Sequence, residues 1–254
     1  MSANTTNGSQ TLSAQGLYYR EYNEQIRAAI EAGADKLFLT EVMGHRYIGA
    51  GIRAPGTTID IEGIPGQDMG AFMDGPSLIV HGNGQDGIGN TMNDGRIEVH
   101  GRAGDVVGYG MRGGRVLVRG DVGYRVGIHM KGYQEKQPVI VVGGTAGDFF
   151  GEYMAGGCLV LLNCTGDGES ASVGRYCATG MHGGVMYIRG HVEDYQLGQE
   201  VARQNLEKSD IDFLRPILDD FAATFDVDNP LKNPSEFIKI APVSARPYGQ
   251  LYVY

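Results

Sequence analysis

Several features that define common protein classes are missing from this sequence. Its 254 residues contain no run of basic residues, and the formal net charge is −9 with a pI near 5.1. Proteins that bind nucleic-acid phosphates are usually basic, with clustered lysine and arginine. No stretch is apolar and long enough to span a bilayer, and the first sixteen residues resemble no secretory signal. We therefore expect one large cytoplasmic domain that binds neither nucleic acid nor membrane.

Motifs that carry chemistry are also scarce. Cys158, Cys164 and Cys177 form no CxxC pair, which is typical of free thiols in a reducing compartment. The six histidines show no HExxH or HxH arrangement. No serine elbow, phosphate loop or Rossmann fingerprint occurs, because none of the GxG strings lies between a strand and a helix. We expect no catalytic, cofactor-binding or metal-binding residue on this chain.

Glycine is abundant, with 41 residues, and it recurs together with methionine in one repeat. The phrase GYGMRGGRVLVRG (108–120) is one copy, in which a methionine is flanked by glycines and followed by alternating apolar residues. Successive copies are spaced by 19 residues at first and then by 24 and 27. The six methionines that mark the copies are Met73, Met92, Met111, Met130, Met154 and Met181.

A repeat of this length cannot bury its own apolar face, so neighbouring copies must stack. Apolar pairs such as Leu78 and Val80 alternate with the period of two that is typical of strands. The sequence thus predicts an all-β fold, a parallel β-helix of about six to seven coils with glycine at the corners. Residues 133–137 and 165–177 are extra to the repeat and are expected to be corner loops, where solenoids often bind partners.

The methionine column has two interpretations. Thioethers bind copper(I), so a column of methionines could form a soft-metal or redox site. Methionine also fills irregular space in a core that every coil must share. We favour packing, and take these six residues as the core of the structural repeat.

A second column contains carboxylates. Asp86 would stack directly over Asp105, and two such groups could act as an acid–base pair or hold a divalent cation. Aspartate in a tight corner more often accepts hydrogen bonds from backbone amides, which is the interpretation we favour. His81 and His100 would likewise be stacked neighbours, with no third metal ligand in view. The carboxylate column, six residues before successive methionines, comprises Gln67, Asp86, Asp105, Tyr124 and Asp148.

The two ends differ from the repeat. We expect a disordered tail at 1–16, a helix and a strand at 17–48, the β-helix at 49–192, and helices with an extended arm at 193–254. A short helix is predicted from about 194 to 207. Ser209 and Asp212 resemble a capping box that opens a second helix. The proline-containing tail predicts an arm, with residues 242–254 docking on this chain or on a partner.

Four segments closely resemble the GXGXG domain that closes the large subunit of glutamate synthase. They are GIPGQDMGAFM (63–73), GDVVGYGMRGGRVLV (104–118), GDFFGEYMAGGCLVLL (147–162) and VGRYCATGMHGGVMYI (173–188). The same fold is similar to the C subunits of formylmethanofuran dehydrogenase and of the formyltransferase/hydrolase complex. The resemblance implies a right-handed parallel β-helix without catalytic residues. The positions that carry the family motif are Gly66, Gln67, Gly70, Gly108, Gly151, Glu152, Gly174 and Gly184.

The resemblance also implies a function. In glutamate synthase the domain packs between an amidotransferase domain and a synthase domain that carries FMN and an iron–sulfur cluster. This sequence lacks those other parts, so it resembles a separate subunit of a split, glutamate synthase-like oxidoreductase that passes an amino group or ammonia to 2-oxoglutarate. FMN and the cluster are then expected on a flavin-dependent synthase subunit, with a glutamine amidotransferase-like subunit as second partner. Two alternatives stay open: the C subunit of a formylmethanofuran-type complex, and an autonomous β-helix that binds small ligands.

Overall fold

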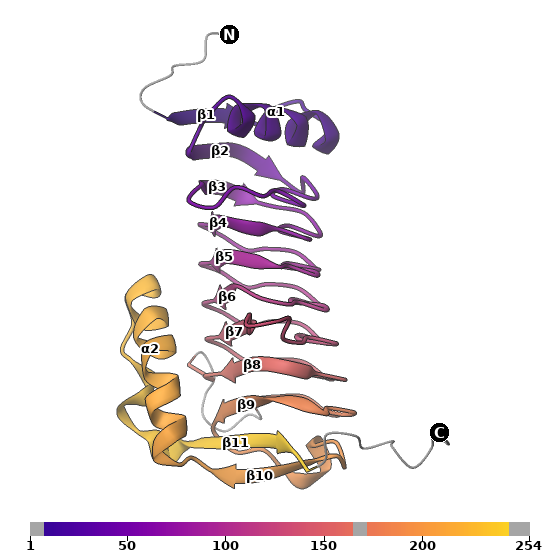
Figure 1. Cartoon of the computed structure of the whole chain (residues 1–254), viewed down its shortest axis with the longest axis vertical. Helices are drawn as coiled ribbons and strands as arrows, with labels where there is room; N and C mark the ends of the chain where they lie inside the picture. Colours follow the sequence, from indigo (N-terminus) through magenta and orange to yellow (C-terminus); the bar gives the residue numbers. More distant parts are fainter. Residues whose placement is uncertain (1–7, 165–171, 244–254) are drawn as a thin grey trace, which may run out of the picture.

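The computed structural model describes residues 8–164 and 172–243, and these form a rod built around one long sheet (Figure 1). The sheet has eleven strands in the order β1 to β9, then β11 and β10. The first nine run parallel, so the repeat is a parallel β-helix. The nine strands are β1 (Ser9–Ser13), β2 (Lys36–Met43), β3 (Thr58–Ile64), β4 (Asp74–Val80), β5 (Asp94–Val99), β6 (Arg115–Val118), β7 (Val139–Val142), β8 (Ala155–Leu161) and β9 (Gly183–Arg189).

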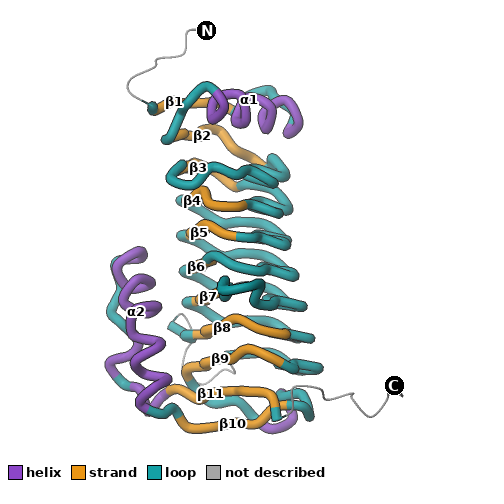
Figure 2. Tube along the Cα trace, in the orientation of Figure 1, coloured by secondary structure: helices purple, strands orange, loops and turns teal. Residues whose placement is uncertain are grey.

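The register in which strands of successive coils pair explains how the repeat forms a continuous core. Each coil places its strand directly beside the same strand of the next coil, so inward apolar residues form columns through the core. One such column is fully buried from end to end and comprises Ile59, Leu78, Ile97, Val116, Ile140, Leu159 and Met186. The remainder of each coil is loop and turn (Figure 2), closed by hydrogen bonds between the backbones of successive coils.

The N-terminal end is closed by α1 (Tyr19–Glu31), which packs Tyr22, Ile26 and Ala29 into the core (Figure 1). The disordered tail predicted for residues 1–16 is wrong for residues 8–16, because β1 lies there and pairs with β2. The polar residues of β1 give no clear strand pattern, so the pairing with β2 decides their conformation. Residues 1–7 lie outside the described part of the chain.

The C-terminal end also departs from expectation. The short helix predicted from about 194 to 207 is instead a single 3-10 turn, η1 (Asp194–Gln196), followed by β10 (Val201–Asn205). The first part of the predicted arm is a packed strand, β11 (Phe237–Pro242), which runs antiparallel to both β9 and β10. Two further 3-10 turns, η2 (Pro230–Lys232) and η3 (Pro234–Glu236), lead into it. Residues 244–254, which make up most of the segment 242–254 predicted to dock, lie outside the described residues.

The long C-terminal helix, α2 (Lys208–Phe225), runs back along the rod beside β6 to β9 (Figure 1). Its capping box is formed by Glu207 and Asp210, two residues before the predicted pair Ser209 and Asp212. Its apolar face covers the outward side chains of these strands in a second core that includes Leu117, Val141, Val160, Leu218 and Phe221.

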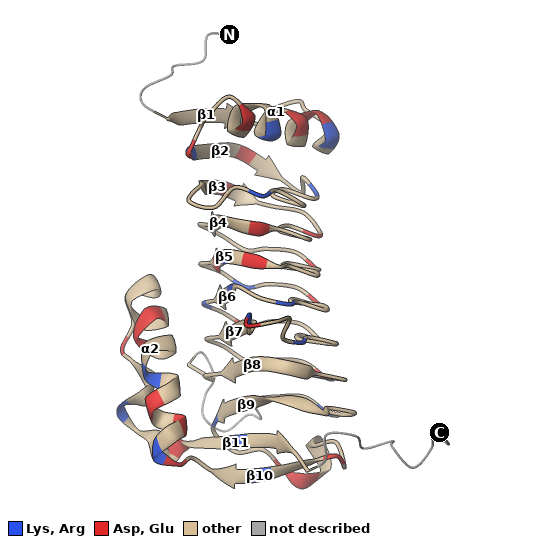
Figure 3. Cartoon of the chain, viewed as in Figure 1, with Lys and Arg blue, Asp and Glu red and all other residues tan. Residues whose placement is uncertain are grey.

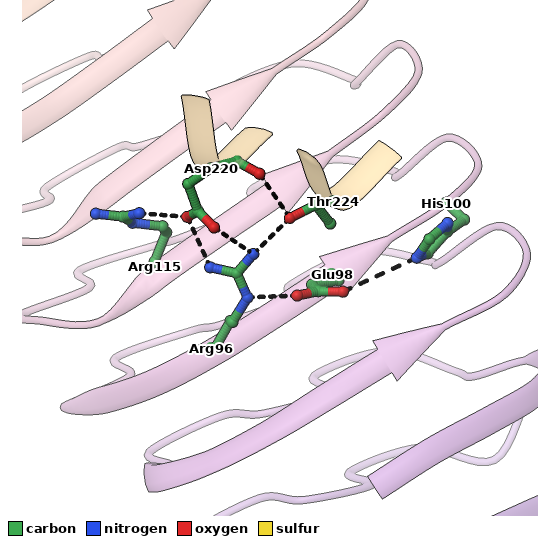
Figure 4. A network of polar contacts seen from close by, with 6 residues as sticks. All are labelled: Arg96, Glu98, His100, Arg115, Asp220 and Thr224. Atoms are coloured by element: carbon green, nitrogen blue, oxygen red, sulfur yellow. Dashed lines mark hydrogen bonds and ion pairs between the residues drawn. The ribbon is translucent and has the colours of Figure 1, made fainter. Parts of the chain in front are cut away.

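A polar cluster fixes the far end of α2 on the rod (Figure 4). Asp220 accepts two hydrogen bonds from the Arg96 guanidinium, at 2.8 and 3.1 Å, and one from Arg115. Thr224 accepts a third hydrogen bond from Arg96, at 2.7 Å. The paired geometry of arginine and carboxylate fixes direction as well as distance, so it sets how α2 lies against the strands.

Candidate functional site

The six repeat methionines lie entirely inside the rod, with side chains that are fully buried. The methyl ends of four of them, Met73, Met92, Met130 and Met154, approach glycines of the next coil. A Cβ added to Gly184, for example, would stand 2.5 Å from the methyl carbon of Met154. The structure therefore places these residues in close core packing, with Gly184 leaving space for the neighbouring methionine.

The carboxylate column lies at one corner, and its three aspartates contact the backbone of the next coil. Asp86 accepts a hydrogen bond from the amide of Asp105 at 2.9 Å, and Asp105 accepts one from the amide of Tyr124 at 3.0 Å. Asp148 accepts from the amide of Arg175 at 2.7 Å, and Gln67 donates to Asp86 at 3.4 Å. These carboxylates bind amides that the strands leave unpaired, but the amides belong to the next coil and not to the following residues.

Two of the family-motif glycines make this arrangement possible. A Cβ on Gly174 would stand 2.3 Å from the Oδ1 atom of Asp148, and one on Gly66 would stand 2.3 Å from the carbonyl oxygen of Gly44. Real Cβ contacts are never that short, so the coils could not stack as they do with larger residues at these positions.

Three other motif glycines, Gly70, Gly108 and Gly151, belong to a left-handed corner that each methionine coil contains. In each coil, φ is positive at three residues, which lie five, three and one positions before the repeat methionine. At the middle position the Cβ would point into the core: it would be 2.6 Å from Ile97 at Gly70, 2.2 Å from Ile140 at Gly108 and 1.9 Å from Met186 at Gly151. Glycine is required there by space as well as by conformation.

The two outer left-handed positions point outward, and many of them carry side chains larger than glycine. Left-handed backbone costs a residue with a Cβ roughly 1–2 kcal/mol. Arg125, His129, Phe149, Tyr153 and Tyr176 nevertheless occupy such positions, with φ between 52 and 61°. Their side chains gather on one face of the rod, which sequence reasoning did not predict.

We call this face the corner patch. His129 and Tyr153 stack with ring centres 5.4 Å apart and planes 9° apart, and Tyr109 meets His129 edge-on at 5.9 Å. Phe149 and Tyr176 stack at 4.9 Å and 15°. The patch thus holds two ladders of rings that cross coil boundaries. It comprises Tyr109, Tyr124, Arg125, His129, Phe149, Glu152, Tyr153 and Tyr176.

Glu152, the acidic member of the family motif, lies within this patch. Its side chain is only 8 % exposed and meets Arg125 at an N–O distance of 3.1 Å, in a geometry that forms no hydrogen bond. The Arg125 guanidinium lies 4.8 Å from the centre of the Phe149 ring, a cation–π distance. Glu152 and Phe149 together hold Arg125 in one orientation at the surface.

The remaining candidates are occupied with structural contacts. The ring centres of His81 and His100 lie 5.5 Å apart. His81 forms a hydrogen bond with the Asp60 carboxylate, and the His100 ring packs against the Phe225 ring in an edge-to-face arrangement. Burial raises the pKa of Cys158 and Cys177 to about 12, so both thiols are protonated and weakly nucleophilic at neutral pH. Within residues 8–164 and 172–243, no three histidine, cysteine or acidic side chains converge as metal ligands.

The family model described as the GXGXG motif matches residues 36–242. The chain belongs to the GXGXG family. Of the three left-handed positions in each coil, only the inward one is glycine throughout the methionine coils before the last.

Two comparisons extend this assignment. An uncharacterized protein of Methanocaldococcus jannaschii is 46% identical over 248 residues, which is 95% of each chain. A chain in the crystal structure of the formyltransferase/hydrolase complex from Methylorubrum extorquens, solved with methylofuran, has a similar fold. Its TM-score is 0.60 at 21% identity, over 82% of this chain and 72% of the other. That neighbour is part of a complex of several subunits. Across the described residues, no helix has the length and apolarity needed to cross a membrane.

Proposed function

We propose that this chain is a structural subunit of a multi-subunit enzyme complex and positions catalytic subunits relative to one another. The observation that carries the proposal is membership of the GXGXG family over residues 36–242, in which the repeat accounts for nearly the whole rod. At about 4.8 Å per strand, the nine parallel strands separate the two ends by roughly 40 Å. Backbone ladders and a close-packed core make such a rod stiff, which suits a spacer.

We assign the complex to the glutamate synthase-like oxidoreductases. The support is the resemblance of four segments of this chain, including the Gln67 and Glu152 regions, to the domain that closes the glutamate synthase large subunit. In this assignment the partners are a flavin-dependent synthase subunit with FMN and an iron–sulfur cluster, and a glutamine amidotransferase-like subunit. In the same assignment we expect no cofactor and no catalytic residue on this chain, and the contacts between coils that its aspartates and motif glycines make support that expectation.

A second candidate rests on a different observation. The formyltransferase/hydrolase complex of Methylorubrum extorquens contains a chain with the same fold over 82% of this one. The alternative role is therefore the C subunit of a formylmethanofuran-type complex in one-carbon metabolism. At 21% identity the likeness supports the fold equally for both roles, so the partner subunits decide between them.

The test is to recover the complex from the native host through a tag on this chain, expressed at its natural level. Mass spectrometry identifies the co-purifying subunits, and a visible spectrum reports flavin and iron–sulfur absorption. We expect an amidotransferase-like subunit and a yellow-brown flavin and iron–sulfur subunit. Recovery with formyltransferase or molybdenum- or tungsten-enzyme subunits would assign the chain to one-carbon metabolism.

The isolated chain provides the control. Purified alone and correctly folded, it should be colourless and inactive. If it purifies alone from the host and is stabilised against heat by a small molecule, the subunit role is wrong and the chain is an autonomous binding protein.

A further inference from the structure

The sheet ends at β10, whose pairing with β11 occupies only one of its two sides. The amide of Val243 donates to the carbonyl of Glu200 at 2.9 Å, next to the first pair of this antiparallel ladder. Facing residues in such a ladder alternate between pairs that exchange hydrogen bonds and pairs that do not. Ala202 and Gln204 therefore bond to β11. The residues whose N–H and C=O groups point instead toward the free edge are Val201, Arg203 and Asn205.

The free edge of β10 is regular. It contains no proline, and its register with β11 runs without a bulge. Its only charged residue, Arg203, faces Ile240 and so lies on the inward side of the sheet. An inward charge discourages pairing when a second strand would bury it alone. Here the guanidinium already donates to the Val192 carbonyl at 2.6 Å and to the Asp194 carboxylate, so a further strand would leave no charge unpaired.

The two ends of the rod differ in what covers them. At the N-terminal end α1 closes the rod, and Tyr22 donates a hydrogen bond to the Leu12 carbonyl of β1 at 3.0 Å. At the C-terminal end α2 turns back along the side of the rod, so no helix of the described residues lies beyond β10 (Figure 1). The last strand of the sheet is therefore open to a further strand.

The charge beside β10 indicates what kind of strand fits. Residues 190–205 contain three carboxylates, those of Glu193, Asp194 and Glu200, and one guanidinium, that of Arg203. The side chains of Glu193 and Asp194 are 56% and 86% exposed. This excess of acid favours an occupant with basic side chains. The lysines of the adjoining elements form neutral pairs with aspartates of α2, Lys208 with Asp212 and Lys239 with Asp210.

We propose that the free edge of β10 receives an extended segment of another subunit of the complex, which adds a strand to the sheet and carries lysine or arginine. Its backbone exchanges hydrogen bonds with Val201, Arg203 and Asn205, and its basic side chains meet Glu193 and Asp194. This inference rests on the proposed function, since it presumes a partner subunit. A second copy of this chain is a poorer occupant, because two β10 edges would bring the same carboxylates together.

One position separates the edge from the rest of β10. In Arg203→Pro the edge loses its central N–H, and the proline ring stands where a further strand would lie. Arg203→Ala is the matched control, because it removes the same side-chain contacts and keeps the N–H. The two variants should melt within about 4 °C of each other, since an edge tolerates proline where the N–H faces solvent.

The opposite edge provides a second control. The amide of Ala14 donates to the Thr40 carbonyl of β2, so Thr11, three residues earlier, faces the free side of β1. Thr11→Pro therefore removes an edge N–H at the other end of the same sheet.

The binding probe is the set of subunits that co-purify with the wild-type chain, titrated back onto each purified full-length variant. Arg203→Pro should bind at least about 10-fold more weakly than Arg203→Ala, because main-chain hydrogen bonds are lost and the edge is blocked. Thr11→Pro should bind as wild type does. Glu193→Lys should also weaken binding, most at low salt, whereas Glu31→Lys on α1 should not.

Hydrogen exchange read at single residues reports strand pairing directly. In the isolated chain the amides of Ala202 and Gln204 should be protected, while those of Arg203 and Asn205 exchange freely. In the complex all four should be protected. A photo-crosslinking amino acid at Gln204 should join the chain to a segment of one partner subunit that contains lysine or arginine.

Three results would overturn the inference while the subunit role stands. They are equal binding by Arg203→Pro and Arg203→Ala, unchanged exchange of the Arg203 amide in the complex, and a crosslink from position 204 to a second copy or to residues 244–254 of this chain. If the wild-type chain purifies without any partner, the proposed function itself is wrong and this inference falls with it.

Discussion

The two halves of the rod share one interior and differ on the outside. Along a single outward column of the strands, the early coils place Asp60, Ile79 and Glu98, and the later coils place Leu117, Val141, Val160 and Tyr187. In Figure 3 acidic residues colour parts of β4 and β5 but not β8; the acidic residue of β4 is Asp74, which lies at the start of the strand and outside this column. The early outward faces meet water, whereas the later ones meet α2.

This contrast separates two determinants of the fold. The inward columns are required by stacking, so they are apolar in every coil. The polarity of the outward columns depends only on what covers them. Their residues are therefore apolar where α2 covers the strands. The Arg96–Asp220 contact marks that boundary, and there the helix changes from apolar packing to paired charges.

The largest expected effect comes from placing a charge on the covered half. Val160→Lys puts an ammonium group beneath α2 with no partner, and should reduce the free energy of unfolding by about 3–5 kcal/mol or release the helix. Ile79→Lys, in the same column between Asp60 and Glu98, should change it by less than about 0.5 kcal/mol. Urea unfolding followed by circular dichroism compares the two. Equal losses would show that the outer faces of the halves do not differ.

The next effect tests the shared interior. Gly70→Ala in the early half and Gly127→Ala in the later half each place a Cβ within 2.6–2.7 Å of a core side chain, at positive φ. Both variants should lose about 2–3 kcal/mol from overpacking and backbone strain. Thermal or urea unfolding of the pair provides the measurement. A much smaller loss in one half would mean that its core is looser.

A smaller effect is expected at the boundary. Asp220→Asn removes the carboxylate that joins α2 to Arg96 and Arg115, although Arg96 keeps its pair with Glu98, and should cost about 1–2 kcal/mol of helix docking. Asp212→Asn breaks only an exposed pair with Lys208 and should cost less than about 0.5 kcal/mol. Hydrogen exchange of α2 amides reports docking directly. Equal protection of α2 in both variants would exclude Asp220 as the residue that fixes the helix.

Acid provides a further test of Asp220. Burial opposes ionisation of this carboxyl, but hydrogen bonds and charges from Arg96 and Arg115 outweigh it, and its pKa is lowered. A carboxyl with a lowered pKa stabilises the fold above its unfolded pKa, and this contribution is lost as pH falls through the folded value. Docking of α2 should therefore weaken below about pH 4 in the wild type, and this dependence should be smaller in Asp220→Asn.

The smallest effect concerns His100, beside the end of α2. Burial, and then the neighbouring His81, lower its pKa, with Arg119 acting in the same direction and Glu98 opposing it. The neutral ring is thus favoured in the fold, and stability is lost as pH falls below about 6.5 toward the lower folded pKa. His100→Gln should flatten the stability profile in that window. His191→Gln, at an exposed histidine, is the control, and identical profiles for the two variants would exclude His100 as the group responsible.

Sequence reasoning found the repeat because its period is local and strict. The methionine spacing and alternating pairs identified the core, since each coil must bury the same columns. It missed β10 and β11 because a strand at the end of a sheet is defined by its partner, which is distant in sequence. Residues 201–205 have no strong strand pattern of their own, and their pairing with residues 238–242 decides their conformation.

The corner patch was missed for a related reason. Its members are spaced irregularly along the chain because inserted loops change the interval between coils. A signal did exist: Phe149 and Tyr176 are rings at the position where an earlier copy of the repeat has Gly87. Without the register between coils, however, nothing in the sequence places Phe149 on Tyr176 or Tyr153 on His129.

By itself the sequence determined the parallel β-helix, its methionine core and its family, because these depend on a repeat that every coil must satisfy to stack on the next. Only the tertiary structure decided which coils α2 covers, that Asp220 fixes it there, and that rings from several coils form one face. Those features depend on contacts between residues far apart along the chain, and the physical requirement they satisfy exists only once the coils are in register.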